Sequence, residues 1–122
     1  MTAGPAAIMS AMAYDEDLAH RLRELLGDDP DVTEKRMFGG LAFLTGGHMA
    51  VAVSGQGGLM VRVDPDETDV LLAEPGARPF EMRGRPMTGW LRVDADAVEG
   101  RAELAAWVRR GAAYARTLPP KG

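Results

Sequence analysis

Apolar residues between Lys35 and Val63 form short runs that are separated by glycine-rich breaks. The breaks fall at Gly46-Gly47 and at residues 55–58. Apolar runs bounded by glycines are typical of strands that are joined by tight hairpins. Successive residues of a strand point to opposite faces of its sheet. The pattern therefore predicts an antiparallel meander of three strands.

This meander has two faces of different character. We expect helices to cover the larger apolar face, which carries Leu41, Phe43, Met49, Val51, Val53, Leu59, Val61 and Val63. The other face carries Ala42, Leu44, His48, Ala50, Ala52, Met60 and Arg62. A solvated sheet face normally carries polar residues, whereas most of these are small or apolar. We therefore expect another part of the chain, a second copy or a ligand to lie on the second face.

The first strand of the meander is predicted to extend from Val32 to Leu44, with an interruption at Gly39-Gly40. Paired glycines inside a strand pattern indicate either a bulge or the close approach of another backbone. Two later strands are predicted at residues 78–82 and 87–93. Pro79 and Pro86 should place these at sheet edges or strand ends, because proline cannot donate a ladder hydrogen bond.

Three segments are predicted to be helices. The first runs from Tyr14 to Leu26, with Asp15 as its N-cap and Gly27 in the left-handed conformation at its end. The second opens with a capping box over residues 64–67 and ends near Ala73. The third has a continuous apolar stripe formed by Leu104, Trp107, Val108, Gly111, Ala112, Ala115 and Leu118. The predicted order is α-β-β-β-α-β-β-α, which is an α+β fold with one antiparallel sheet of about five strands and three helices.

The composition narrows the class of protein. The chain has 122 residues, 14 of them basic and 18 acidic, which gives a net charge of −4 and the size of a single domain. This negative charge disfavours a nucleic-acid partner, because binding to nucleic acid depends mainly on neutralising phosphates. The net charge does not exclude a local basic patch. There is no cysteine, which excludes disulfides and cysteine-based metal sites and fits a cytoplasmic location. No apolar run approaches the roughly 18 residues that cross a membrane.

The domain itself is predicted to span residues 14–120. Residues 1–13 are mostly small and apolar and lack the basic start of a signal peptide, so we expect a disordered extension. Met9 and Met12 are alternative translation starts to Met1.

Groupings that would support catalysis or metal binding are not apparent in the sequence. His20 and His48 fall on a predicted helix and a hairpin edge, with no third group to orient a base. Residues 55–58 join two antiparallel strands, so they lack the strand-to-helix context of a phosphate-binding loop. We therefore expect no catalytic residues, no metal site and no cofactor.

Arginines near the glycine-rich segments are the candidate binding residues. If Arg36 and Arg62 share a sheet face beside Gly39-Gly40, they would form a pocket for an anionic group, because guanidinium forks suit carboxylates and phosphates. The full candidate set is Arg36, Phe38, Gly39, Gly40, Arg62 and Arg85. The alternative is that the arginines only form surface ion pairs, with Asp64, Asp66, Glu67 or Glu81.

The sequence also resembles the N-terminal domain of the TfoX/Sxy family. The resemblance rests on Arg36-Met37-Phe38-Gly39-Gly40, on residues 60–63, on residues 84–90 and on residues 107–115. It covers residues 14–120 and implies a small α+β fold related to secretion chaperones. The founders of the family regulate natural competence together with other transcription factors, and they carry a C-terminal helical domain that we do not expect in this sequence. The family supplies no catalytic residues.

Two functions follow from these observations. The first is a non-enzymatic regulatory module, connected with transcription, that acts through protein partners and is a homodimer. The second is a protein that binds a small anionic ligand or nucleic acid at the arginine and glycine edge.

Overall fold

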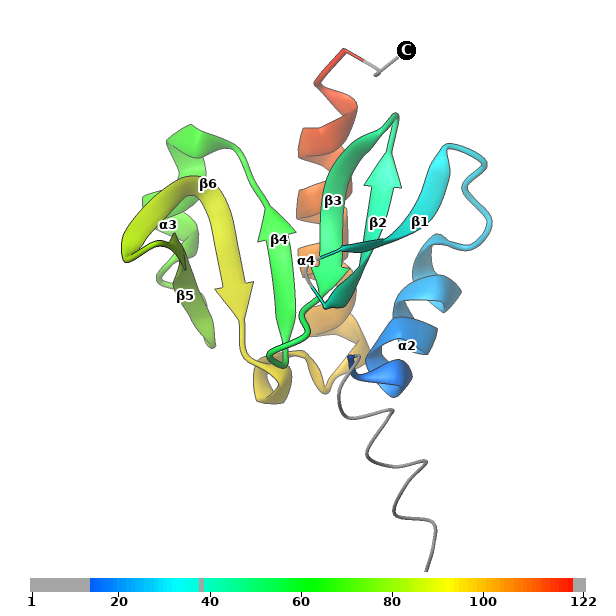
Figure 1. Ribbon diagram of the computed structural model, residues 1–122, viewed down its shortest axis with the longest axis horizontal. Coiled ribbons are helices and arrows are strands. Elements are labelled where there is room, and N and C mark those ends of the chain that lie inside the picture. Colours follow the sequence, from blue (N-terminus) through cyan, green and yellow to red (C-terminus); the bar gives the residue numbers. More distant parts are fainter. Residues whose placement is uncertain (1–13, 38, 120–122) are drawn as a thin grey trace, which may run out of the picture.

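A six-stranded antiparallel sheet and three helices make up residues 14–37 and 39–119, which are the residues described by this computed structural model (Figure 1). The helices are α2 (Glu16–Leu26), α3 (Thr68–Leu71) and α4 (Arg101–Arg116), and single 3₁₀ turns cover Pro65–Glu67 and Ala95–Val98. The strands are β1 (Val32–Met37), β2 (Gly40–Thr45), β3 (His48–Val53), β4 (Leu59–Arg62), β5 (Ala77–Met82) and β6 (Arg85–Val93). The α+β class is confirmed, with the order α-β-β-β-β-α-β-β-α. The extension predicted at residues 1–13 lies outside the described residues.

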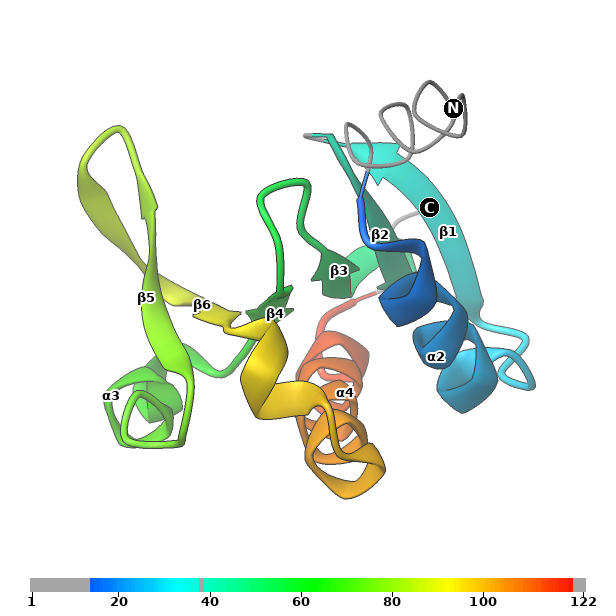
Figure 2. The same cartoon turned by 90° about the horizontal axis from the view of Figure 1, so that it is seen from below.

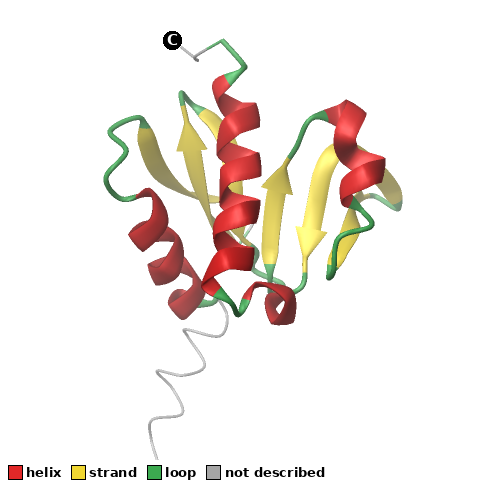
Figure 3. Ribbon diagram, turned by 180° about the vertical axis from the view of Figure 1, so that it is seen from behind, coloured by secondary structure: helices red, strands yellow, loops and turns green. Residues whose placement is uncertain are grey.

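The sheet has helices on one face only. Its strand order is β1-β2-β3-β4-β6-β5, and every neighbouring pair is antiparallel. Figures 2 and 3 show α2, α3 and α4 on the same side of the sheet, with α4 across its middle. At both ends the sheet curves away from the helices, so that its other face is concave in Figure 2. We call that other face the open face.

One strand was missing from the sequence prediction because residues 32–44 form a hairpin and not a single strand. β1 ends at Met37, β2 begins at Gly40, and these two residues pair across the turn. Gly39 has a φ of +76°, a conformation that favours glycine and lets the chain reverse direction. The predicted close backbone approach is confirmed at Gly40, where a Cβ atom would overlap the carbonyl oxygen of Val53.

β3 contains a bulge that changes which of its residues face the helices. Phe43 pairs with Val51 and Leu44 pairs with Met49, so Ala50 is the extra residue. Ala50 therefore packs in the helix-side core, and Met49 lies on the open face. The sequence prediction placed these two residues the other way round and is wrong at both. A bulge sets two residues of one strand against one of its neighbour, which reverses the alternation.

The helix-side core follows the predicted apolar stripes. The buried residues of α4 are Leu104, Trp107, Val108, Gly111, Ala112 and Ala115, as predicted from their spacing. Leu118, the last residue of the predicted stripe, instead lies beyond the end of α4 and is half-buried. The Asp15 carboxylate caps α2 by accepting a 3.1 Å hydrogen bond from the Leu18 amide. Gly27 does not take the predicted left-handed conformation: its φ is −63°, because the chain continues in a right-handed turn that the Asp29 amide closes onto Leu26.

The connection between β4 and β5 contains less regular helix than the sequence predicted. Residues 65–67 form a 3₁₀ turn capped by the Asp64 carboxylate, and α3 ends at Leu71. The buried Thr68 hydroxyl accepts a 3.0 Å hydrogen bond from the Gly89 amide of β6. This bond fixes the short helix against the strand next to it. Pro79 lies in the edge strand β5 and Pro86 at the start of β6, as predicted.

An ion pair between α2 and β1 should make stability depend on pH. The Arg23 guanidinium donates to both carboxylate oxygens of Glu34, at 2.8 and 2.9 Å, and this holds the pKa of Glu34 below its ordinary value of 4.5. A carboxyl group with a lowered pKa stabilises the fold above its unfolded pKa, and this stabilisation is lost as pH falls through the folded pKa. We expect Glu34→Gln to be less stable than the wild type at neutral pH.

The difference in free energy of unfolding between the wild type and Glu34→Gln should shrink below pH 4.5, where the wild-type carboxyl begins to bind its proton. This difference should be small at every pH because the side chains of Arg23 and Glu34 are partly solvated. Urea unfolding of both proteins at neutral pH and at about pH 3 measures the difference. A difference that stays constant over this range would contradict the proposed origin of the stabilisation.

Candidate functional site

The open face carries a second, smaller apolar cluster. Ala42, Met49 and Ala52 are buried in it, and Met37, Leu44, Met60 and Trp90 pack around them half-exposed. In the described part of the chain, all three helices lie on the opposite face. The β5–β6 hairpin, which belongs to the same sheet, borders the cluster, and what lies on this face stays a prediction.

A groove of about 560 Å³ lies between this cluster and the β5–β6 hairpin. Its lining includes all five methionines of residues 14–119, namely Met37, Met49, Met60, Met82 and Met87, together with Trp90 and Phe80. We call it the methionine groove. Its volume is within the range of ligand sites, and its lining is mainly apolar. Methionine side chains are flexible and polarisable, so such a surface can adapt to apolar groups of different shape.

Two local irregularities bring the methionines together. The bulge at Ala50 moves Met49 to the open face. A tight turn at Arg83 and Gly84, with φ of 55° and 78°, folds the β5–β6 hairpin so that Met82 and Met87 line the same groove. These two side chains are 44% and 37% exposed, which is unusual for large apolar residues of a folded domain.

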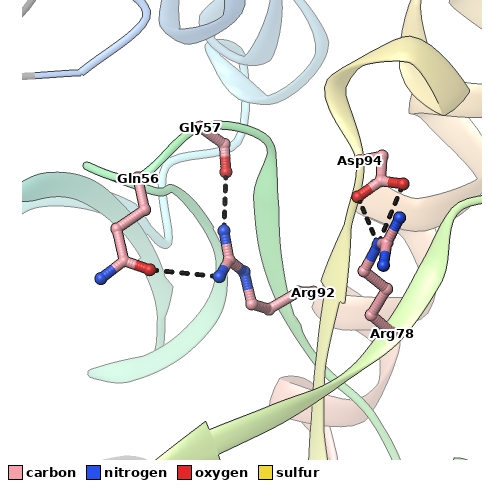
Figure 4. Close-up of polar contacts among 5 residues, drawn as sticks. All are labelled: Gln56, Gly57, Arg78, Arg92 and Asp94. Carbon is pink, nitrogen blue, oxygen red and sulfur yellow. Dashed lines mark hydrogen bonds and ion pairs between the residues drawn. The ribbon is translucent and has the colours of Figure 1, made fainter.

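Arg92 lies at one end of the groove and is held by neutral acceptors (Figure 4). Its guanidinium donates to the Gln56 side-chain oxygen at 3.1 Å and to the Gly57 carbonyl oxygen at 3.3 Å. The neighbouring Arg78 is different, because it pairs with Asp94 at 2.8 Å and lowers the pKa of that carboxyl group. Arg92 therefore orients the β3–β4 loop, and the ion pair with Asp94 is made by Arg78.

Arg62 lies between two aromatic rings. Its guanidinium carbon is 5.0 Å from the centre of the Trp90 ring on β6 and 5.7 Å from that of Tyr114 on α4. Cation–π contacts of this kind are each worth about 0.5–1 kcal/mol when exposed. The contact orients Trp90 at the wall of the groove. No carboxylate of the described residues lies within ion-pairing distance of Arg62.

The arginines predicted as a site are not brought together. Arg36 lies on β1 opposite Leu41, which faces the helices, and its guanidinium is 6.0 Å from the Tyr14 ring. Arg62 lies on β4, with β2 and β3 between it and β1. Arg85 lies at the start of β6, beside the hairpin turn. The pocket expected from Arg36 and Arg62 beside Gly39-Gly40 is therefore not formed, and the role of each arginine in binding stays a prediction.

The two glycines of the candidate set have clear positions. Gly39 forms the β1–β2 turn, and Gly40 lines the methionine groove at the start of β2. Phe38 lies outside the described residues. The acidic partners suggested for the arginines also differ, since the structure pairs Arg23 with Glu34, Arg78 with Asp94, Arg110 with Glu74 and Arg116 with Asp29.

Sequence reasoning did not find the residues that define the groove. Met37, Met82, Met87, Trp90 and Arg92 were not proposed as a site. One signal was present, because every methionine after the first thirteen residues turns out to be in this groove. Only Met60 had been placed on the second face from its alternation, and it does lie there.

The histidines and acidic residues show no convergence. His20 lies 3.5 Å from Glu24 on the exposed side of α2, and the His48 ring nitrogen Nε2 lies 2.7 Å from the Pro119 carbonyl oxygen. Over residues 14–37 and 39–119, no three histidine or acidic side chains are grouped so that they could hold a metal ion. In the same residues, every helix is too short or too polar to span a bilayer.

The sequence of this chain matches the model of one protein family. The model of the TfoX N-terminal domain matches residues 24–115, which is most of the chain. The chain belongs to the TfoX N-terminal domain family. A search of curated proteins found no match. The match includes β1 to β6 and nearly all of α4, so the whole methionine groove lies within this TfoX N-terminal domain.

The TfoX N-terminal domain is a regulatory domain family that is generally not catalytic. The resemblance inferred from residues 36–40 is thereby confirmed. Of those residues, Arg36 and Met37 end β1, and Gly40 begins β2 and packs tightly against the end of β3. The β1–β2 turn therefore shapes the wall of the groove, even though Arg36 lies on the side of the sheet that faces the helices.

Proposed function

We propose that this TfoX N-terminal domain is a non-enzymatic regulatory module that binds a protein partner in its methionine groove. The observation that carries the proposal is the apolar, concave lining of the open face, to which all five methionines of residues 14–119 contribute. Contiguous exposed apolar surface on a folded domain usually marks an interaction site. Methionine-rich surfaces are typical of sites that accept protein segments of varied sequence.

A protein partner fits this surface better than a small anion does. Binding an anion at the arginine and glycine edge requires convergent arginines, and Arg36 and Arg62 lie in strands that are separated by two others. The groove itself presents mostly apolar surface and is partly open along its length. A second copy of the chain is one partner of this kind, as the expected homodimer requires.

Site-specific crosslinking in the protein's own cells tests the proposal. A photoreactive phenylalanine analogue at Met87, which is exposed at the groove, should give a covalent product with a protein. The same analogue at Arg109, which is exposed on α4 on the other side of the sheet, should not give that product. Mass spectrometry of the product identifies the partner, and a product of twice the chain's own mass identifies the homodimer.

The absence of any product from Met87 would contradict the proposal, provided that the labelled protein is folded. Equal products from Met87 and Arg109 would also contradict it, because the groove would then not be the site of contact. Circular dichroism of both labelled proteins provides the check on folding.

A further inference from the structure

One basic side chain, Arg92, lines the methionine groove, and Lys35 and Arg62 lie on other strands of the same sheet, although the chain as a whole is acidic. Residues that are directly opposite in an antiparallel pair share a face of the sheet. Lys35 pairs with Ala42 and Arg92 pairs with Met60, and both partners belong to the open face. Arg62 pairs with Trp90 on the same face. Lys35 and Arg92 therefore place positive charge on the open face, and Arg62, whose guanidinium also lies 5.7 Å from the centre of the Tyr114 ring of α4, lies beside Trp90 of that face.

These three cations are not neutralised by ion pairs within the described residues. Lys35 is exposed, Arg62 lies against two rings, and Arg92 is bonded to neutral oxygens. Among the residues that line the groove, Glu81 is the one acidic side chain. The chain has a net charge of −4, so the positive open face stands in contrast to the rest of the surface.

We propose that the methionine groove binds an acidic peptide segment, in which apolar side chains enter the groove and flanking Asp or Glu residues meet Lys35, Arg62 and Arg92. The proposal rests on the proposed function and adds the chemistry of the partner. Apolar anchors supply most of the affinity of such a contact, and complementary charges at its rim supply specificity and speed of association. The arrangement on the open face matches this division, with methionines and Arg92 in the lining of the groove and Lys35 and Arg62 outside the lining.

A peptide fits the open face better than single-stranded nucleic acid. Nucleic acid bound without sequence preference needs a continuous basic track and several aromatic rings on which bases stack. The groove offers Trp90 and Phe80 but is lined mainly by methionine, and its cations are spaced across different strands. An enclosed apolar ligand is also a poorer fit, because the groove is partly open and would leave such a ligand in contact with water.

Selection from a random peptide library tests the proposal without knowledge of the natural partner. The full chain is immobilised and presented with a displayed library of random peptides of about 15 residues, a length that spans a groove-binding segment. We expect the enriched peptides to combine large apolar residues with more Asp and Glu than the unselected library contains. Enrichment without an acidic excess, or no enrichment at all, overturns the inference.

Charge variants then show where an enriched peptide binds. The affinity for a labelled enriched peptide is measured by fluorescence anisotropy. In the double variant Lys35→Glu/Arg92→Glu, this affinity should fall by about tenfold or more, and association at low salt should be slower. Glu81→Gln should strengthen binding, since it removes the carboxylate at the groove. Arg109→Glu on the helix side changes the net charge by as much as each of the two substitutions at the open face. It should leave the affinity for the peptide unchanged. Lys35→Glu alone keeps the test valid if loss of Arg92 disturbs the β3–β4 loop.

The outcomes separate this inference from the proposed function. One outcome is that the peptides bind the groove and compete with crosslinking at Met87, but bind the charge variants with unchanged affinity. This would leave the proposed function intact and would overturn the inference that the partner is acidic. Tighter binding of oligo-thymidine than of any enriched peptide, with the same response to the variants, would overturn the peptide in favour of nucleic acid. Failure of crosslinking at Met87 together with failure of the selection would overturn both.

Discussion

Replacement of Gly40 by alanine is expected to lower the free energy of unfolding by about 3 kcal/mol, the upper end of what overpacking usually costs. A Cβ atom at this position would overlap the Val53 carbonyl oxygen and would lie 3.1 Å from the Gly55 amide nitrogen. Both obstacles are backbone atoms, so a change of rotamer cannot relieve the overlap. The β1–β2 turn must then move away from the end of β3, and the groove wall moves with it.

Thermal unfolding followed by circular dichroism measures the effect, which corresponds to roughly 12 °C for a domain of this size. The neighbouring Gly39→Ala is the matched control. Gly39 has a φ of +76° and open space around its Cβ position, so alanine there should cost only about 1 kcal/mol through backbone strain. If the two variants lose equal stability, the tight contact at Gly40 is not the cause.

Gly111→Ala in α4 should destabilise the domain by about 2 kcal/mol, although alanine is the better helix former. Propensity alone would make the variant about 1 kcal/mol more stable. The added Cβ atom, however, would overlap the Ala50 carbonyl oxygen and approach Val61 Cγ1 to 3.3 Å. Helix α4 would have to withdraw from β3, which loosens the contacts of Trp107 and its neighbours in the core.

Urea unfolding of this variant gives the sign of the change directly. Ala113→Gly, at an exposed position of the same helix, is the control and should cost about 1 kcal/mol by propensity alone. An increase in stability on Gly111→Ala would refute the close approach of α4 to the bulge in β3.

Features that depend on local spacing could be predicted from the sequence. The stripe of α4 needs only a helical period, and the cap of α2 needs only an acidic residue before an apolar repeat. Both the period from Leu104 to Ala115 and the hydrogen bond of Asp15 appear as expected. The strands at β5 and β6 were found for the same reason, within one or two residues of their ends.

Features that depend on contacts between distant segments could not be predicted. Alternation along His48–Val53 looks the same with and without a bulge, because alanine is small enough to face either side. The bulge at Ala50 becomes evident only beside Gly111, which lies sixty-one residues later in the sequence. The groove likewise needs β1, β3, β4 and the β5–β6 hairpin together, so no single stretch of the sequence reveals it.

The bulge at Ala50 makes the two faces of the sheet interdependent. The same extra residue brings the Ala50 backbone against Gly111 on one side and turns Met49 into the groove on the other. Regular pairing of the same residues without the bulge would instead return Met49 to the helix side, together with Val51, and take it from the binding surface. The shape of the groove on one face therefore depends on the bulge whose backbone packs against Gly111 on the other face.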